Sequence, residues 1–136
     1  MSKAVRRTLI VLAVAALVVV TGWSIMPTPI STDLSQVGQG RPALVLAYEN
    51  FSPSGGEALT RVNALRGEYE DRMVFALADL GAPHGQAFAN RHGLRDALAV
   101  VLTADGAIHS RGVVPADPRQ LRERLDGVLA STQPQG

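Results

Sequence analysis

Residues 43–48 (ALVLAY) and residues 73–78 (MVFALA) decide the fold of this chain. Each is a continuous apolar run of strand length, which is typical of a strand that is covered on both faces. Between them Leu59, Val62 and Leu65 recur at helical spacing and predict one apolar helix stripe. A strand, a helix and a strand within about 35 residues predict a βαβ unit with parallel strands and a right-handed crossover.

The sequence also predicts where the intervening helix starts and ends. Ser54 and Glu57 have the spacing of a capping box, in which Ser54 is the N-cap and Glu57 lies at N3. Residues 49–56 precede the apolar stripe and are expected to form a loop. We therefore expect a helix from about Gly55 to Asp71.

The second half of the domain continues the same alternation. Pro83 and Gly93 bracket a second helix, residues 98–102 form a third apolar run, and an Asp-Gly turn leads into a returning strand over residues 107–114. A last helix begins at Asp117, where a proline follows at N1. The order β-α-β-α-β-β-α predicts an α/β fold with a mixed central sheet between helices.

An apolar run precedes this domain. Residues 9–26 (LIVLAVAALVVVTGWSIM) carry no charge, and about 18 residues of helix span about 27 Å, close to the thickness of a bilayer core. Arg6 and Arg7 lie just before the run and predict a cytoplasmic N-terminus, and Trp23 suits the outer interface. A cleavable signal peptide is the alternative, but the run is long for one and no A-x-A site follows it.

These patterns divide the chain into five parts. We expect a cytoplasmic basic segment over residues 1–7, a transmembrane signal-anchor helix over 8–26, a linker over 27–42, a folded domain over 43–130 and a disordered tail over 131–136. The linker contains prolines, glycines and small polar residues without a sustained period. The expected location is a bacterial inner membrane, crossed once, with the C-terminal domain in the periplasm or outside the cell.

Composition excludes several classes of function. The chain has no cysteine, which excludes disulfides, thiol nucleophiles and thiolate metal sites. The formal net charge is +1, and basic residues at the N-terminus account for it, so the domain lacks the basic face that nucleic acid requires. The expected partners are therefore the lipid bilayer and other membrane or periplasmic proteins.

Over about residues 41–130 the chain resembles the thioredoxin family. The resemblance rests on the element order, the loop before the first domain helix, the stretch 92–99 (HGLRDALA), the Asp105-Gly106 hairpin and the amphipathic last helix. It implies a thioredoxin-like three-layer α/β/α sandwich with a mixed central sheet, behind one N-terminal transmembrane helix.

The departures from that family concern its redox groups. The family's Trp-Cys-x-x-Cys motif corresponds to Phe51-Ser52-Pro53-Ser54-Gly55, so Ser52 and Gly55 stand at the cysteine positions. Leu46 stands where the family has a buried acid, and Leu98 stands at the cis-proline position. A cis bond before a residue other than proline costs about 3 kcal/mol, so we expect a trans bond there. The resemblance implies the scaffold and does not carry over oxidoreductase activity.

Other candidate sites are weak. Ser52 or Ser54 as a nucleophile needs a placed base and an oxyanion hole, which the sequence does not supply. His84 and His92 lie two helical turns apart but about 80° around the axis, so with Asp79 they make a poor metal site. The sequence therefore predicts no catalytic residue, no metal and no cofactor.

These observations favour a redox-inactive interaction module, an accessory or assembly subunit of a membrane complex. Its expected contact surface joins the degenerate loop Phe51, Ser52, Pro53, Ser54 and Gly55 to Ala97 and Leu98. Two alternatives stay open: a thiol-disulfide or peroxide-related redox protein that works with cysteines of a partner, and a domain that binds a small ligand or metal.

Overall fold

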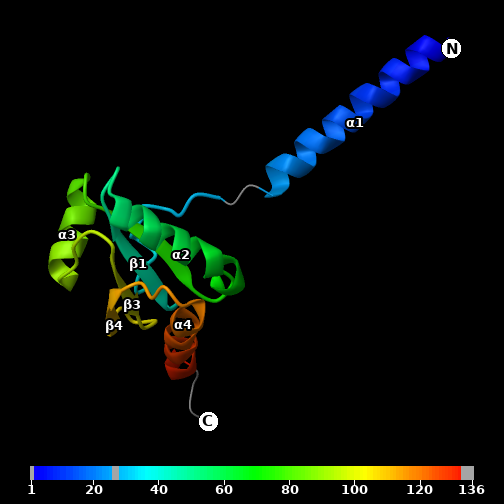
Figure 1. Ribbon diagram of the computed structural model, residues 1–136. Coiled ribbons are helices and arrows are strands. Elements are labelled where there is room, and N and C mark those ends of the chain that lie inside the picture. Colours follow the sequence, from blue (N-terminus) through cyan, green and yellow to red (C-terminus); the bar gives the residue numbers. More distant parts are fainter. Residues whose placement is uncertain (1, 26–27, 133–136) are drawn as a thin grey trace.

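The computed structural model describes residues 2–25 and 28–132; residues 1, 26–27 and 133–136, and the side chains of residues 23–25, lie outside the described part. The elements are α1 (Lys3–Ile25), β1 (Ala43–Tyr48), α2 (Pro53–Tyr69), β2 (Val74–Asp79), α3 (Pro83–His92), β3 (Leu98–Leu102), β4 (Ile108–Val113) and α4 (Pro118–Thr132) (Figure 1). This is the predicted order, and the predicted bounds of β1 and β3 match those of the structure.

The four strands form one mixed sheet in the order β2-β1-β3-β4. β1 pairs parallel with β2, so the predicted βαβ unit is confirmed. β1 and β3 are antiparallel, and so are β3 and β4. The carboxyl ends of both parallel strands therefore lie at one edge of the sheet, where the loops after Tyr48 and Asp79 meet.

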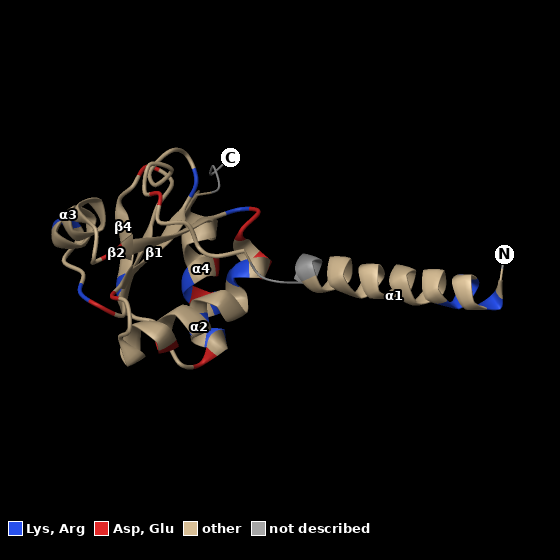
Figure 2. Cartoon of the chain, turned by 90° about the horizontal axis from the view of Figure 1, so that it is seen from above, with Lys and Arg blue, Asp and Glu red and all other residues tan. Residues whose placement is uncertain are grey.

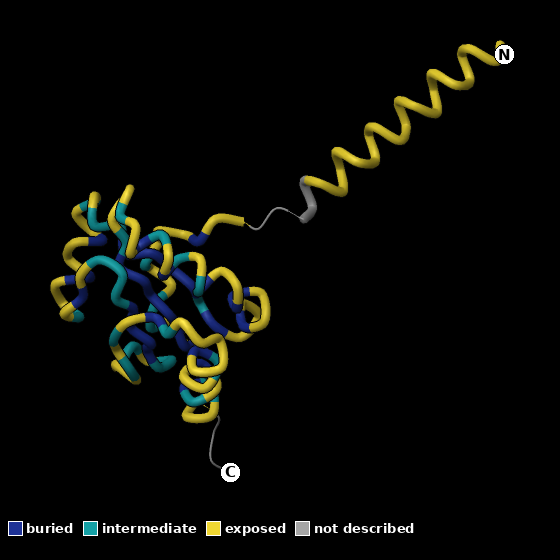
Figure 3. The backbone as a smooth tube through the Cα atoms, in the orientation of Figure 1, coloured by how far each residue is buried: buried dark blue, intermediate teal, exposed yellow. Residues whose placement is uncertain are grey.

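Helices cover both faces of the sheet, as predicted. Leu44 and Leu46 of β1 pack with α2 and α4 in one apolar cluster, whereas Ala43, Val45 and Ala47 pack with α3 in another. Alternate residues of a strand point to opposite faces, so this one strand contributes to both cores. The result is a three-layer α/β/α sandwich whose buried residues follow the sheet (Figure 3).

The α3 layer approaches the sheet closely because small residues line the contact. A Cβ added at Gly85 would lie 2.0 Å from the Asp79 carbonyl oxygen, so no other residue fits there without a shift of the backbone. Gly93 ends the helix in the left-handed conformation, at φ 65°, which confirms its predicted role as the C-terminal cap.

Helix α1 is exposed along its described length and contacts no core (Figure 3). Residues Lys3–Gly22 are long and apolar enough to cross a membrane. The basic residues lie at the N-terminal tip of this helix (Figure 2). The helix begins at Lys3, before the predicted start at residue 8, and of its predicted end Met26 lies outside the described residues, as does the side chain of Trp23.

The stretch after α1 is not a free linker over its described residues. Ile30 is buried at 9% exposure, and Ser31 forms a parallel bridge with Ala76 of β2. The Leu77 amide donates to the Ser31 carbonyl at 2.9 Å. The Arg66 guanidinium, itself only 7% exposed, donates to the Thr28 carbonyl. A single apolar residue among prolines and small polar residues gives no periodic signal, so the sequence could not indicate this docking.

Both ends of α2 differ from the sequence prediction, as does the C-terminal end of α4. Ser52, not Ser54, is the N-cap of α2, and Pro53 occupies N1, where its missing amide hydrogen costs nothing. The helix ends at Tyr69 rather than Asp71. At the other end of the chain, Ser131 and Thr132 continue α4 and do not belong to a disordered tail; the rest of that predicted tail lies outside the described residues.

Candidate functional site

The predicted contact surface lies at the carboxyl end of β1, where residues 49–52 meet the segment 95–98 that leads into β3. The Ala97 amide donates to the Ala47 carbonyl at 2.9 Å, which ties this second segment to the end of β1. The structure thus brings together the two loops that the sequence predicts to act as one surface.

Asp96 holds these two loops in place. Its Oδ1 accepts the Glu49 amide at 2.9 Å, and its Oδ2 accepts the Ser52 hydroxyl. The Ser52 oxygen in turn accepts the Gly55 amide at 3.2 Å, which is the N-cap bond of α2. The single Ser52 proton and the lone pair that faces the helix are thereby committed to structural hydrogen bonds.

Gly55 completes this arrangement because it leaves room for Asp96. A Cβ at position 55 would lie 2.7 Å from Asp96 Oδ1 and 3.2 Å from Tyr48 Cδ2. The position that corresponds to the second family cysteine therefore accommodates the carboxylate of a neighbouring loop. This geometry serves packing and offers no place for a second reactive side chain.

Phe51 is the exposed tip of the site. Its side chain is fully exposed, at 100%, and its backbone has φ 66°. Ala97, across from it in the second loop, has φ 70°. Among the described residues these two are the only non-glycine positions with positive φ. Such conformations cost of order 1 kcal/mol or more and persist where the surroundings impose them, here through the contacts of Asp96.

The remaining positions that correspond to the family motif carry no reactive group. Leu46 has no exposed surface and packs in the core between the sheet, α2 and α4. The described peptide bonds are all trans, including the one before Leu98, as predicted. Pro53 and Ser54 are exposed in the first turn of α2 and make no contact with the second loop that the structure records.

A shallow groove of about 470 Å³ borders the loops on the α3 side. Its lining is Glu49, Leu80, Gln86, Ala89, Asn90, Leu94, Arg95 and Asp96. Leu80 lies there because its amide donates to the Tyr48 carbonyl at 3.0 Å. The groove is open and mixed in polarity, and it extends the surface around Phe51 toward α3.

The other candidate ligands lie apart from one another. Among the described residues no three His, Asp or Glu side chains are placed to hold a metal ion. The His92 ring stacks on Phe88 at 4.1 Å, His84 Nε2 lies 3.3 Å from the Thr32 carbonyl oxygen, and Asp79 accepts the Gly81 amide at 2.8 Å.

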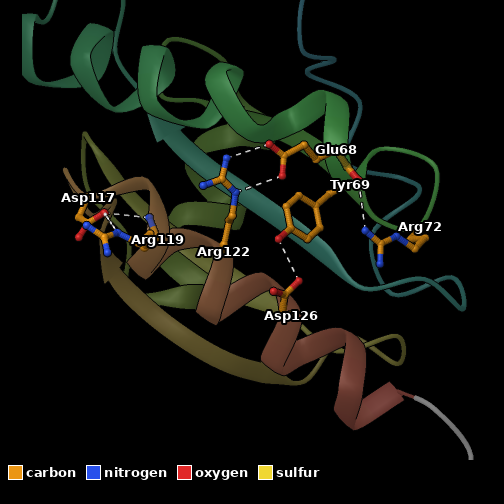
Figure 4. Close-up of polar contacts among 7 residues, drawn as sticks. All are labelled: Glu68, Tyr69, Arg72, Asp117, Arg119, Arg122 and Asp126. Atoms are coloured by element: carbon orange, nitrogen blue, oxygen red, sulfur yellow. Dashed lines mark hydrogen bonds and ion pairs between the residues drawn. The ribbon is translucent and has the colours of Figure 1, made fainter.

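Polar and charged side chains join α2 to α4 (Figure 4). Arg122 donates two hydrogen bonds to Glu68, at 2.9 and 3.1 Å. Its spacing of four residues from Asp126 within α4 would by itself suggest an ion pair with that residue instead. Asp126 instead accepts the Tyr69 hydroxyl at 2.9 Å. Burial and this hydrogen bond raise the pKa of Tyr69 to about 12.

The structural roles of two residues could not be predicted from the sequence. Asp96 fixes the loops, and Arg66 fixes the segment after α1. The Ser52–Asp96 and Arg66–Thr28 bonds join residues 44 and 38 positions apart. Short-range patterns carry no signal for such pairs.

Comparison with known proteins supports the fold. No family model and no curated protein matches this sequence. Among solved structures, Trxlp from Edwardsiella tarda EIB202 is similar with a TM-score of 0.55 and 14% identity, over 65% of this chain and 84% of that one. An uncharacterized thioredoxin-like protein from Clostridium perfringens has a TM-score of 0.59 and 13% identity, over 71% of this chain and 77% of that one. The chain has the thioredoxin-like fold, without cysteine and without a cis-proline in its described part.

Proposed function

We propose that this chain is a membrane-anchored, redox-inactive thioredoxin-like protein that binds another protein through its degenerate active-site loop. In this proposal α1 crosses a bacterial inner membrane once, the N-terminus is cytoplasmic, and the folded domain lies in the periplasm or outside the cell. The chain serves as an accessory or assembly subunit of a membrane complex.

The observation that carries the proposal is the exposure of Phe51 on a fixed loop. Aromatic side chains dominate the binding energy of many protein interfaces, and an anchor that is already ordered loses little entropy on binding. Asp96 supplies that order through Glu49 and Ser52. A fully exposed aromatic ring on such a loop fits a partner surface better than it fits water.

Two observations support redox inactivity. The chain has no cysteine, so it cannot form the mixed disulfide through which thiol-disulfide exchange proceeds. Ser52 cannot replace the thiol, because its hydroxyl is committed to Asp96 and to the cap of α2. In this proposal the loop binds a partner and carries no thiol chemistry.

The proposal is tested by purification of the full chain from its native membranes in mild detergent. We expect a membrane or periplasmic protein to co-purify in constant ratio with the wild type and with Gln120→Ala, an exposed position on α4. Phe51→Ala should lose that protein at unchanged expression and melting temperature. A chain that purifies alone, or a partner that Phe51→Ala retains in full, contradicts the proposal.

A turnover assay addresses the redox alternative. The purified full chain should not accelerate reduction of a disulfide substrate by a dithiol above the rate of the Ser52→Ala variant. Turnover that persists after removal of contaminating reductases, and that Ser52→Ala abolishes, would overturn redox inactivity.

A further inference from the structure

We propose that the domain is held with the C-terminal end of α2 against the lipid headgroups and with the Phe51 loop directed away from the membrane. This inference rests on the proposed membrane anchoring and adds to it the orientation of the binding surface. We call the two ends of the domain the clamp end, at Arg66 and Glu70, and the loop end, at Phe51.

The first step is that the chain is fastened to the domain almost as soon as α1 ends. The buried Arg66 holds the Thr28 carbonyl, Ile30 enters the core, and Ser31 pairs with β2. The Arg41 guanidinium reinforces the same end by donating to the Glu70 carbonyl at 3.2 Å. Residues 28–31 therefore belong to the rigid domain and add nothing to the reach of the tether.

The second step is the shortness of the chain between the end of α1 and the first fastened residue. Ile25 ends the described part of α1, and Thr28 is the first fastened residue, so residues 26 and 27 alone lie between them. Three steps of about 3.8 Å limit their Cα–Cα separation to about 11 Å. If α1 crosses the bilayer, the clamp end cannot leave the headgroup region.

The third step is the distance between the two ends of the domain. Helix α2 has 17 residues and is therefore about 25 Å long. Arg66 lies in its last turn, and Pro53 in its first turn is separated from Phe51 by the N-cap Ser52 alone. The rigid helix thus separates the fastened end from the loop by most of the depth of the domain.

Charge favours an upright domain over one that lies on its side. At the clamp end Arg41, Arg66 and Arg72 offset the carboxylates of Glu70 and Asp71. At the loop end, the carboxylates of Glu49, Glu57 and Asp96 lie with Arg95, and Glu57 pairs with Arg61 at 3.7 Å, so carboxylates still outnumber arginines there. The negative potential of an anionic leaflet repels the loop end more strongly than the clamp end.

The orientation defines which partner the loop can reach. In this orientation Phe51 stands roughly 20–25 Å beyond the clamp end, about the length of α2, and so outside the headgroup layer. The loop therefore meets a folded, water-exposed part of another protein, and lipid-embedded segments are out of its reach.

The absence of cysteine makes the test direct, because each engineered thiol is unique. Single-cysteine variants Asp71→Cys and Phe51→Cys of the full chain, labelled with a fluorescent donor, are reconstituted in phosphatidylethanolamine/phosphatidylglycerol vesicles that carry headgroup-linked acceptors. We expect energy transfer from position 71 to exceed that from position 51 by about twofold or more, given the length of α2. Equal transfer, or stronger transfer from position 51, overturns the orientation.

A release variant and a flotation assay separate the possible failures. Ile30→Ser combined with Arg66→Met should free residues 28–31, lengthen the tether and lower the transfer from position 71, whereas Gln120→Ala should not. If energy transfer from position 71 in the release variant equals that of the wild type, the fastening of residues 28–31 does not hold the domain near the membrane. A chain that does not float with the vesicles overturns the anchoring and the orientation together, whereas floating with equal transfer overturns the orientation alone.

Discussion

Ser52 stands where the resemblance to the thioredoxin family places a cysteine, and in this structure its role is structural. It caps α2, accepts the Gly55 amide and donates to Asp96. Ser54, the cap that the spacing to Glu57 predicts, is exposed in the first turn. The proline between the two serines explains the difference, because it needs no partner for an amide hydrogen at N1.

This reassignment gives a paired prediction. Ser52→Ala should lower the free energy of unfolding by about 1 kcal/mol, because the cap bond is lost and Asp96 loses a donor. Ser54→Ala should stay within about 0.5 kcal/mol, as expected for an exposed site. Urea denaturation of the domain in the detergent-solubilised chain measures both values. A larger loss for Ser54→Ala would restore the capping box that the sequence predicts.

Two adjacent glycines provide a second paired test at this scale. Gly55→Ala should destabilise the domain, since its Cβ would meet Asp96 Oδ1 at 2.7 Å. Gly56→Ala meets nothing within 4 Å and should stabilise α2 by up to about 1 kcal/mol through helix propensity. The melting temperatures of the two variants, each compared with wild type, measure these opposite effects. Shifts of the same sign would contradict the packing described for Asp96.

At the scale of elements, α2 and α4 are joined by Tyr69 and Asp126 under the exposed Glu68–Arg122 pair. The folded state raises the pKa of Tyr69 to about 12, above its usual value near 10, so it favours the protonated phenol. The corresponding stability is fully present below about pH 10 and is lost as the pH rises toward 12, because the unfolded chain releases its proton first.

Tyr69→Phe isolates this contribution. The variant should lose about 1 kcal/mol of stability near neutral pH, where the hydrogen bond to Asp126 is missing. Between pH 10 and 12 wild-type stability should fall more steeply, and the two curves should converge. Thermal melting across this pH range is the measurement, and parallel curves would show that Tyr69 is not the titrating group.

Most elements were predictable because their signals are local. Apolar runs mark β1, β2 and β3, Gly93 marks the end of α3, and the Asp-Gly turn marks the hairpin. The docking of residues 28–31 was not predictable, since Ile30 is one apolar residue without periodicity. The Arg122–Glu68 pair was missed for another reason: helical spacing identifies neighbours within α4 and says nothing about which helix packs beside it.

For the candidate site, the sequence predicted which loops meet but not what holds them. Ser52, Gly55, Ala97 and Leu98 do lie at one edge of the sheet, as the family resemblance implies. Asp96 reaches Ser52 and Glu49 across the fold, a contact that no short-range pattern carries. Phe51 also has a positive φ of 66°, which no short-range pattern in the sequence indicates.

At the scale of the whole molecule, three features combine: an apolar exposed helix, a short connection to the domain that Arg66 fastens, and a thioredoxin-like domain with an exposed aromatic loop at its far end. The solved structures of similar shape share 13–14% of their residues with this chain, so they support the fold and leave the function to the site. In the proposed arrangement the clamp end lies at the membrane and the loop end faces a partner protein.

The most direct test of partner binding is photocrosslinking in intact cells. The full chain carries p-benzoylphenylalanine in place of Phe51, or in place of Gln120 on the exposed side of α4. Irradiation of the Phe51→p-benzoylphenylalanine chain should give one discrete crosslinked protein, absent from the Gln120 variant and lost when Asp96→Ala unlocks the loop. No product at position 51, or the same products from both positions, would contradict binding through this loop.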